Sequence, residues 1–328
     1  MDPVDALLEI ASLLERERAS RYRAKAFRQA AATFQDLPAD VQDDPTRLRA
    51  AKGIGESTFA VIRQAQAGDV PEYLIELRGD VEPERVSALR GKLRGDLHAH
   101  TEWSDGTTSI EVMAAAARAQ GHEYQAITDH SPRLRVARGL SVERLREQIP
   151  QVRAQSGDGF TLLAGIEVDI LEDGALDQDD AVLAELDVVV ASVHSKLRMD
   201  GRAMTKRMIA AVSHPRVNVL GHCTGRLVQG DRGTRPPSAF DAAAVFAACA
   251  ENGVAVEINS RPERQDPPDE LIAIALDAGC LFSIDSDAHA PGQLSLLDHG
   301  AERAERAGVP ASRIVTTWGL SRLLAWAE

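Results

Sequence analysis

The spacing of apolar and polar residues divides the chain into two parts. Residues 4–17 and residues 20–34 place apolar side chains at helical intervals, and the second segment is basic on its other side. From residue 95 onward, short apolar and β-branched runs alternate with longer amphipathic segments. Repeated strand–helix units are typical of parallel sheets, so the pattern predicts an all-helical first part and an α/β second part.

A glycine-containing break interrupts the helical part. After a further predicted helix at 46–51, the sequence reads Lys52-Gly53-Ile54-Gly55-Glu56, and another helical segment follows. The two glycines permit a tight turn, and the N–H groups at the start of the next helix can bind a phosphate. Alone, this spacing is weak evidence, because a glycine that merely ends a helix is the commoner explanation.

The second part contains seven predicted strands, most of them followed by a predicted helix. The strands are predicted at 95–101, 124–130, 161–168, 187–194, 217–223, 254–259 and 281–286. The helices are predicted at 109–120, 141–155, 178–185, 202–212, 238–252, 268–278 and 292–307. A last short strand at 313–317 is expected before a helix at 319–327. About seven units favour a barrel over an open sheet, and barrels of this kind carry their functional residues at the carboxyl ends of the strands.

Potential metal ligands occur at these strand ends. His98 and His100 are separated by one residue, so on a strand both imidazoles point to the same face and can hold one ion. An isolated pair of this kind is weak evidence, but the other apolar runs also end in histidine or carboxylate residues. The further candidates are Asp105, His130, Glu167, His194, His222, Asp287 and His289.

Composition restricts the class of protein. The chain has 328 residues and a net charge of −13, which argues against coating nucleic acid or an anionic membrane by bulk attraction. The first 94 residues carry a net charge of −1 and the remainder −12, and clustered carboxylates in the second part are compatible with a cation site.

The three cysteines form no spaced framework, and no apolar run approaches the ~18 residues of a membrane span. The first residues do not read as a signal peptide, so a cytoplasmic protein without a membrane partner is predicted. No oligomeric state is predicted.

The second part strongly resembles the PHP (polymerase and histidinol phosphatase) superfamily, in particular the C-terminal PHP domain of bacterial family X DNA polymerases. The resemblance is carried by Gly95-Asp-Leu-His-Ala-His-Thr101, Ser104-Asp-Gly106, Ile127-Thr-Asp-His-Ser131, Gly165-Ile-Glu-Val-Asp-Ile-Leu171, Val189-Val-Ala-Ser-Val-His-Ser195, Leu220-Gly-His-Cys-Thr-Gly-Arg-Leu227, Glu257-Ile-Asn-Ser-Arg-Pro-Glu-Arg-Gln-Asp266 and Ser286-Asp-Ala-His289. It implies a distorted (β/α)7 barrel with a three-metal site.

The first part resembles the N-terminal eight-kilodalton-type domain of family X polymerases, with a helix-hairpin-helix motif that binds the DNA backbone without reading sequence. The resemblance implies that Lys52, Gly53 and Gly55 contact DNA, against the alternative of a purely structural helical cap. A lysine used by some family members as a lyase nucleophile is replaced here by Val61, so lyase activity is not expected. The expected domains are a helical domain at 1–80, a linker at 81–94 and the barrel at 95–328. This linker leaves no room for a polymerase palm, so nucleotide polymerisation is not expected.

The resemblance also implies nine metal ligands. One ion is expected on His98, His100, Glu167 and Asp287, a second on Glu167, His194 and His222, and a third on Asp105, His130 and His289. Six imidazoles with three carboxylates favour zinc, manganese or iron over calcium or magnesium. The other histidines, His122, His214 and His299, are interpreted as surface residues.

Closely spaced cations suit cleavage of phosphate esters. The hypothesis is that a hydroxide bridging the metals, held by Glu167 and Asp287, attacks phosphorus. Arginines follow the strand ends, and a guanidinium can bind phosphate through two parallel hydrogen bonds. Arg226 and Arg264 lie in family-like sequence and are the first candidates for the substrate phosphate; the others are Arg133, Arg135, Arg138 and Arg261.

Three functions are compatible with these features. The first is a metal-dependent phosphodiesterase acting on DNA, as a 3′–5′ exonuclease or an abasic-site or 3′-end processing enzyme in repair. The second is a small-molecule phosphomonoesterase of the histidinol-phosphatase type, which would not need a DNA-binding domain. The third is a non-catalytic, metal-stabilised scaffold, against which a complete ligand set argues.

Overall fold

The computed structural model describes residues 1–17, 21–79, 87–229 and 233–328. The chain forms two compact units, Met1–Arg85 with Pro291–Gln293 and Val86–Ala290 with Leu294–Glu328. The first residue of the predicted helix at 20–34, the predicted domain limit at residue 80 and the linker residues 81–86 lie outside the described residues. The predicted domain limits therefore stay predictions.

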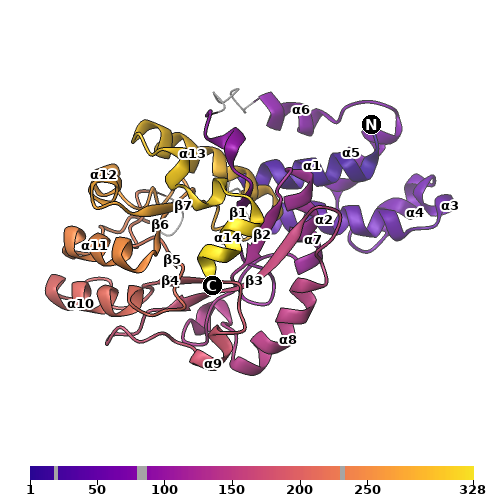
Figure 1. Ribbon diagram of the computed structural model, residues 1–328. Helices are drawn as coiled ribbons and strands as arrows, with labels where there is room; N and C mark the ends of the chain where they lie inside the picture. The colour runs from indigo at the N-terminus through magenta and orange to yellow at the C-terminus, as the bar shows by residue number, and fades with distance from the viewer. Residues whose placement is uncertain (18–20, 80–86, 230–232) are drawn as a thin grey trace. The chain divides into compact units, whose positions relative to one another are not determined.

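The first unit is helical. Its helices are α1 (Pro3–Arg16), α2 (Arg21–Asp36), α3 (Ala39–Gln42), α4 (Pro45–Ala50), α5 (Glu56–Gln66) and α6 (Glu72–Gly79) (Figure 1). Helix α1 begins where the Asp2 side chain accepts hydrogen bonds from the N–H groups of Val4 and Asp5. Apolar residues of α1, α2 and α5 form one buried core, and the helical spacing of the sequence predicted the apolar faces of α1 and α2.

The turn between α4 and α5 requires glycine at one position. Gly53 has a φ of +100°, and a Cβ atom there would lie 2.7 Å from Thr33 Oγ1. The residues predicted to contact DNA, Lys52, Gly53 and Gly55, are exposed. The Gly55 N–H donates to Thr58 Oγ1, which fixes the start of α5. The hairpin is thus present, and its contact with DNA stays a prediction.

The second unit is built on one seven-stranded parallel sheet in the order β1 to β7. The strands are β1 (Gly95–Asp96), β2 (Tyr124–Ile127), β3 (Thr161–Asp169), β4 (Val188–Ser192), β5 (Val219–Leu220), β6 (Ala255–Asn259) and β7 (Leu281–Asp285). Beyond β1, Ala99 pairs with Ala288 after β7, so the two edges approach each other. This nearly closed barrel with helices around it confirms the predicted (β/α)7 fold.

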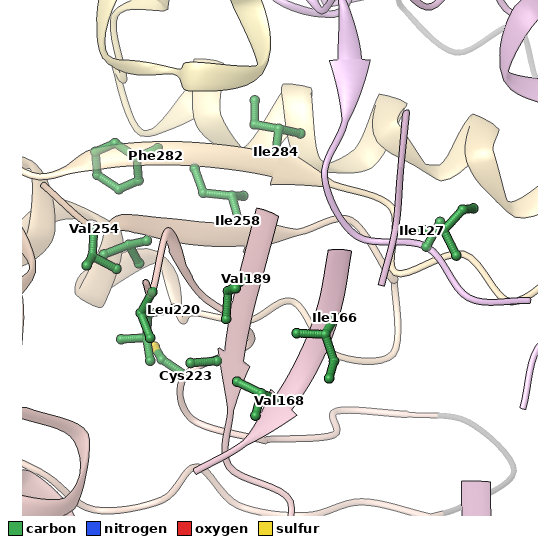
Figure 2. Close-up of a cluster of buried hydrophobic side chains, with 14 of the residues drawn as sticks. Ile127, Ile166, Val168, Val189, Leu220, Cys223, Val254, Ile258, Phe282 and Ile284 are labelled. Atoms are coloured by element: carbon green, nitrogen blue, oxygen red, sulfur yellow. The ribbon is translucent and has the colours of Figure 1, made fainter. Parts of the chain in front are cut away.

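Successive side chains along each strand point to opposite faces of the sheet, and this alternation separates two apolar clusters. Ile166 on β3 and Val189 on β4 face outward into the large core beneath the helices (Figure 2). Leu163 on β3 faces the barrel interior, and Glu167 lies four residues later on the same face of that strand. The side chains of β3 that face the barrel interior are therefore apolar at the start of the strand and include a carboxylate near its end. This arrangement places polar groups at the mouth of the barrel.

The predicted strand at 313–317 is wrong. The segment forms two short 3₁₀ turns, η4 (Ala311–Arg313) and η5 (Val315–Thr317), with a single bridge from Ile314 to Phe282. Its β-branched residues do not extend the sheet, because Val315 and the nearby Trp318 pack into the inner apolar cluster. This segment fills the end of the barrel opposite the polar site.

The helices of the second unit agree with the pattern, with shifted ends. They are α7 (Ile110–Ala119), α8 (Val142–Arg153), α9 (Asp180–Leu183), α10 (Gly201–Val212), α11 (Ala242–Asn252), α12 (Asp269–Asp277), α13 (Leu297–Arg306) and α14 (Leu320–Ala327). The 3₁₀ segments η1 (Arg90–Lys92) and η2 (Arg135–Ala137) also belong to this unit, whereas the first three residues of η3 (Pro291–Leu296) belong to the first unit. Helix α11 begins at Ala242, after Asp241, whose carboxylate accepts from the Ala244 N–H, and not at residue 238 as predicted. Within the described ranges, every helix is too short or too polar to cross a membrane.

His122 was predicted to be a surface residue, and this is wrong. Its side chain is 5% exposed, and its Nδ1 lies 3.2 Å from Gln125 Oε1. The residue follows the turn at Gly121, and its backbone N–H bonds to the Ala117 carbonyl, which draws the side chain inward. Burial and, to a smaller extent, the positive charge of Arg90 lower the pKa of His122 to about 4, although the contact with Gln125 opposes them.

Candidate metal centre

The polar side chains at the barrel mouth lie just beyond the hydrogen-bonded strands. Several strands are shorter than predicted: β1 ends at Asp96, β2 at Ile127 and β5 at Leu220. The chain stays extended past these ends, since His130 pairs with Glu167 and Ala99 with Ala288 as isolated bridges. The candidate ligands therefore stand on short segments anchored by the sheet.

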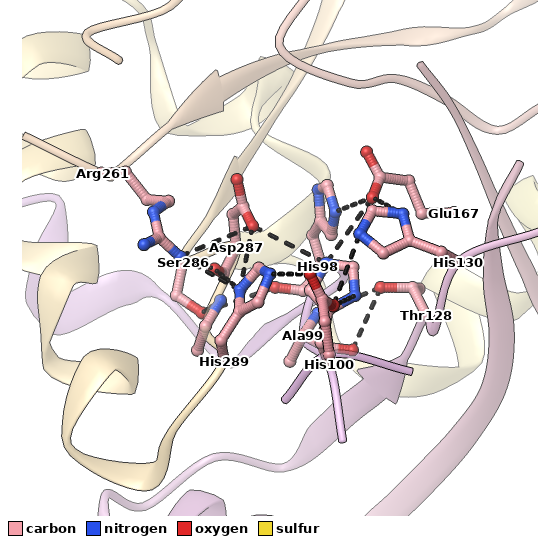
Figure 3. A network of polar contacts seen from close by, with 12 residues as sticks. His98, Ala99, His100, Thr128, His130, Glu167, Arg261, Ser286, Asp287 and His289 are labelled. Carbon is pink, nitrogen blue, oxygen red and sulfur yellow. Dashed lines mark hydrogen bonds and ion pairs between the residues drawn. The ribbon is translucent and has the colours of Figure 1, made fainter. Parts of the chain in front are cut away.

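Four overlapping groups of side chains have potential ligand atoms within 4.8 Å of one another. The groups are His100, Asp105, His130 and His289; His98, His100 and Asp287; His98, Glu167 and His222; and His130, Glu167 and His194. Together they contain the nine residues named in the sequence analysis, and much of this network is visible in Figure 3. The division of these ligands among three ions stays a prediction.

Glu167 occupies the middle of this cluster. Its Oε1 lies 2.8 Å from His222 Nε2 and 3.2 Å from His194 Nε2. Its Oε2 lies 2.9 Å from His130 Nδ1 and 3.4 Å from His98 Nε2. One carboxylate therefore faces imidazoles from four different segments of the barrel. With its two oxygens it could bind two neighbouring cations.

His100 connects this group with the remaining carboxylates. Its Nε2 lies 3.6 Å from Glu167 Oε2 and 3.6 Å from Asp287 Oδ1, while its Nδ1 lies 3.9 Å from Asp105 Oδ1. Asp105 in turn approaches His130 Nε2 at 3.5 Å and His289 Nε2 at 3.4 Å. The nine side chains thus form one continuous cluster.

The hydrogen bonding of the cluster fits a set of metal ligands. Among the described residues, both ring nitrogens of His100 and Nδ1 of His222 are buried without a hydrogen-bond partner. A buried polar atom without a partner costs about 1–3 kcal/mol, so such atoms are rare unless something else binds them. Six imidazoles and three carboxylates are a donor set suited to zinc, manganese or iron.

The carboxylates are held in the charged form that a cation requires. Burial raises the pKa of Glu167, but the imidazoles of His194 and His130 outweigh burial and hold this pKa well below its usual range. Burial likewise opposes ionisation of Asp287, while the guanidinium groups of Arg264 and Arg261 hold its pKa well below the usual range.

The imidazole between these carboxylates is held in the neutral form. Burial and the neighbouring rings of His289 and His130 keep the pKa of His100 well below its usual value. A neutral imidazole is the metal-binding form of histidine, so the protonation state of His100 also suits a ligand.

Two further carboxylates orient the imidazoles and were not identified from the sequence. Glu257 Oε1 lies 2.6 Å from His98 Nδ1, and its Oε2 accepts from the His222 N–H at 2.5 Å. Asp169 Oδ1 lies 2.6 Å from His194 Nδ1. Such partners fix the tautomer and direction of a ligating ring. A signal existed for Asp169, which follows Glu167 by two residues on the same strand face.

Asp287 is held by an unusual backbone and several donors. Its φ of +50° lies in the left-handed region, which a residue other than glycine rarely adopts. Asn259 Nδ2 and Arg264 Nε donate to its Oδ2 at 3.1 and 3.0 Å, and Arg261 Nη1 donates to its carbonyl at 2.7 Å. These contacts fix the carboxylate toward the cluster and compensate for the strained backbone.

The two arginines predicted to bind substrate phosphate have internal partners. Arg264 is 8% exposed and pairs with Asp287, so it lies at the edge of the cluster. Arg226 Nε donates to the Arg264 carbonyl at 3.0 Å, and its Nη2 donates to the Gln265 carbonyl. Both side chains therefore support the loop after β6, and their contact with a phosphate stays a prediction.

Both parts of the chain are similar to known proteins. A family model described as PHP domain matches residues 96–261, and one described as helix-hairpin-helix domain matches residues 1–68. The chain is 36% identical over 238 residues to the DNA polymerase/3′-5′ exonuclease PolX of Bacillus subtilis (strain 168). That match covers 72% of this chain and 41% of the Bacillus protein, so this chain spans less than half of that relative.

Other relatives are phosphatases by name. The chain is 30% identical over 230 residues to a probable phosphatase of Aeromonas hydrophila subsp. hydrophila, which covers 67% of this chain and 88% of the relative. A solved structure of histidinol phosphate phosphatase from Lactococcus lactis subsp. lactis Il1403, in complex with zinc, L-histidinol and phosphate, is 18% identical. It has a TM-score of 0.46 and covers 66% of this chain and 94% of that chain.

Proposed function

The chain belongs to the PHP domain family, whose members are metal-dependent phosphoesterases, and we propose that it hydrolyses phosphodiester bonds of DNA. The proposed activity is that of a 3′–5′ exonuclease, or of an enzyme that processes 3′ ends or abasic sites in repair. The observation that carries this proposal is the presence, in one chain, of a nine-ligand cluster and a helix-hairpin-helix domain.

Two further observations support DNA as the substrate. The hairpin at Lys52, Gly53 and Gly55 is exposed, and its N–H groups at the start of α5 suit a phosphate backbone. The Bacillus relative is named as a DNA polymerase/3′-5′ exonuclease, and the region it shares with this chain is 238 residues long. We propose that the helical domain holds the DNA backbone while the barrel cleaves it.

The proposed cofactors are three divalent cations, either zinc, manganese or iron, on the nine residues of the cluster. When bound, the cations supply the positive charge that activates water and neutralises the phosphate oxygens. Glu167 and Asp287 contribute charged carboxylates at the middle of the cluster. Glu257 and Asp169 hold the rings of His98 and His194, so that the opposite ring nitrogens point toward Glu167.

The exposure of the cluster indicates where the phosphate enters. The His98 and His100 side chains are fully buried, whereas Asp105, His289 and His194 are 34%, 22% and 14% exposed. The open side of the centre is therefore the side of these last three residues. We propose that the substrate phosphate approaches from this side.

A direct assay tests the proposal. The protein is loaded with Mn²⁺ and incubated with 5′-end-labelled DNA, and in parallel with histidinol phosphate and p-nitrophenyl phosphate. Progressive shortening of the labelled strand from its 3′ end is expected. In His98→Ala and Asp287→Ala variants, metal content and hydrolysis should both fall, while His214→Ala serves as a histidine control outside the cluster. Retained metal with full hydrolysis in the first two variants would refute the role of the cluster.

A second candidate function is a small-molecule phosphomonoesterase. It is favoured by the Aeromonas probable phosphatase, 88% of which is covered by a match to this chain. Release of phosphate from histidinol phosphate or p-nitrophenyl phosphate, without any shortening of DNA, would support this candidate over the DNA phosphodiesterase. Absence of both activities would support a non-catalytic role.

A further inference from the structure

A cavity of about 500 Å³ opens beside His194, at the edge of the candidate metal centre. Ligand pockets measure roughly 300–1,000 Å³, so this cavity has room for one group the size of a nucleoside. Its walls come from the segments after β2, β3 and β4, and they include Arg133, Leu134, Leu171, Glu172, Asp173 and His194. Because His194 belongs to both, a group in the cavity lies next to a phosphate at the metal centre.

The walls of the cavity are held by hydrogen bonds. Arg207, which is 1% exposed, donates from Nε to the Ile170 carbonyl at 3.1 Å and from Nη1 to the Ser195 carbonyl at 2.9 Å. The Arg133 N–H donates to Asp177 Oδ2 at 2.6 Å. Arg207 on α10 therefore ties the loops after β3 and β4 together, the Arg133–Asp177 bond ties the loop after β2 to the loop after β3, and the cavity is largely preformed.

The charge of the lining disfavours a second phosphate. Asp169, Glu172 and Asp173 line the cavity, and Arg133 is the one lysine or arginine among its described lining residues. The Asp169 carboxylate is engaged by His194 Nδ1, and Asp173 Oδ1 accepts from the Ala175 N–H at 3.0 Å. Glu172 and Asp173 are exposed at the turn after β3. Like charges a few ångströms apart repel, so an additional phosphate beside Glu172 and Asp173 is disfavoured.

The same lining suits an uncharged nucleoside. Leu134 and Leu171 offer apolar surface for a base or a sugar, and carboxylate oxygens accept hydrogen bonds from a sugar hydroxyl. We propose that the cavity holds the terminal nucleoside on the 3′ side of the scissile phosphate, and that Glu172 and Asp173 select a 3′ end with a free hydroxyl over one with a phosphate. This inference rests on the proposed phosphodiesterase function and names the part of the substrate that enters the site.

Calorimetric titration of the full-length, Mn²⁺-loaded protein tests the selection. dTMP and thymidine 3′,5′-bisphosphate differ by the 3′-phosphate that the acidic wall should reject. The protein is expected to bind dTMP about tenfold tighter than the bisphosphate, and the ratio should fall below about threefold in Glu172→Gln/Asp173→Asn. The control Glu302→Gln/Glu305→Gln removes the same charge from exposed positions on α13 and should keep the original ratio. Equal or tighter binding of the bisphosphate, or an unchanged ratio in the first variant, overturns the proposal.

Cleavage assays separate this inference from the proposed function. A linear strand with a 3′-hydroxyl should release nucleotides faster than one with a 3′-phosphate, and a circular single strand should stay intact. Cutting of the circle at the rate of the linear strand overturns the inference and leaves the phosphodiesterase proposal standing. If no DNA is cleaved, the proposed function fails, and the titration still decides what the cavity binds.

Discussion

His98 Nδ1 and Glu257 Oε1 lie 2.6 Å apart, although the two residues are separated by 159 positions in the chain. The same Glu257 carboxylate accepts from the His222 N–H. It therefore holds both the imidazole of His98 and the backbone of His222, two candidate metal ligands from different segments of the barrel. Neither oxygen is needed as a metal ligand for this role. Glu257 is therefore a positioning residue of the candidate metal centre.

Replacement of Glu257 should weaken metal binding. Loss of a carboxylate that orients a ligating histidine lowers metal affinity roughly 10–100-fold, so Glu257→Ala is expected in this range. Glu257→Gln keeps an oxygen for His98 Nδ1 and should lose less. Metal content after dialysis against graded chelator measures the effect, with exposed Glu251→Ala on α11 as the control. Normal metal retention in a folded Glu257→Ala protein would show that this carboxylate is only part of the core.

Glu167 should be the most sensitive position of the cluster. Glu167→Gln keeps the size of the side chain but removes the charge that faces His222, His194 and His130. Loss of stabilisation of several kcal/mol corresponds to a fall in hydrolysis of about a thousandfold or more. Metal content and hydrolysis are measured together, and circular dichroism checks the fold. A variant with full metal content and unchanged turnover would contradict the central position assigned to this carboxylate.

Lys52→Glu should weaken DNA cleavage without affecting small esters. The side chain is exposed at the hairpin, and a lost phosphate contact lowers affinity across all sequences and reduces the salt slope by about one. KM for DNA should rise, while hydrolysis of p-nitrophenyl phosphate should stay constant. Lys206→Glu, an exposed lysine on α10, makes the same charge change in the other unit. An equal effect of both substitutions would mean that only net charge matters.

The sequence named the nine residues of the candidate metal centre, which the structure brings together, but it did not name the residues that support them. Parallel strands of a barrel end at the same rim, so residues such as His98 and Glu167 could be placed together from strand order alone. Which carboxylates bind and which orient could not be predicted, because Asp169 stands on the same strand face as Glu167 and its pairing with His194 depends on tertiary structure.

Burial and local backbone form were the other features that the sequence did not predict. The run around Val315 has the β-branched composition of a strand, but its side chain fills the barrel end beside Trp318, and packing overrides strand propensity there. His122 was expected at the surface because a polar residue between a helix and a strand usually lies there. In the structure it lies beneath the neighbouring segments and contacts Gln125.

Gly174→Ala should disturb the acidic wall of the cavity. Gly174 has a φ of +93°, and a Cβ atom would lie 2.5 Å from Ala210 Cβ and 2.8 Å from the Arg207 carbonyl. Gly279 has a φ of +88° with nothing within 4 Å of such an atom, so Gly279→Ala isolates the backbone strain of about 1 kcal/mol. Gly174→Ala should lose more stability than this control in urea unfolding, because the turn carrying Glu172 and Asp173 must move. Equal losses would mean that the turn accommodates the methyl group.

The stability of the protein should fall in acid partly because of His122. Burial, together with the charge of Arg90, lowers the folded pKa of His122 to about 4, whereas an unfolded histidine titrates near ~6.5. The unfolded chain therefore binds this proton first, so the contribution is intact above about pH 6.5 and is lost as the pH falls toward 4. The expected loss of stability is at most about 3 kcal/mol.

Urea unfolding at pH 7 and pH 5 measures this loss. His122→Gln should lose less stability between the two pH values than the unmodified protein, while His214→Gln should behave like the unmodified protein. An identical pH dependence in His122→Gln would show that His122 accepts a proton in the folded state as readily as in the unfolded one.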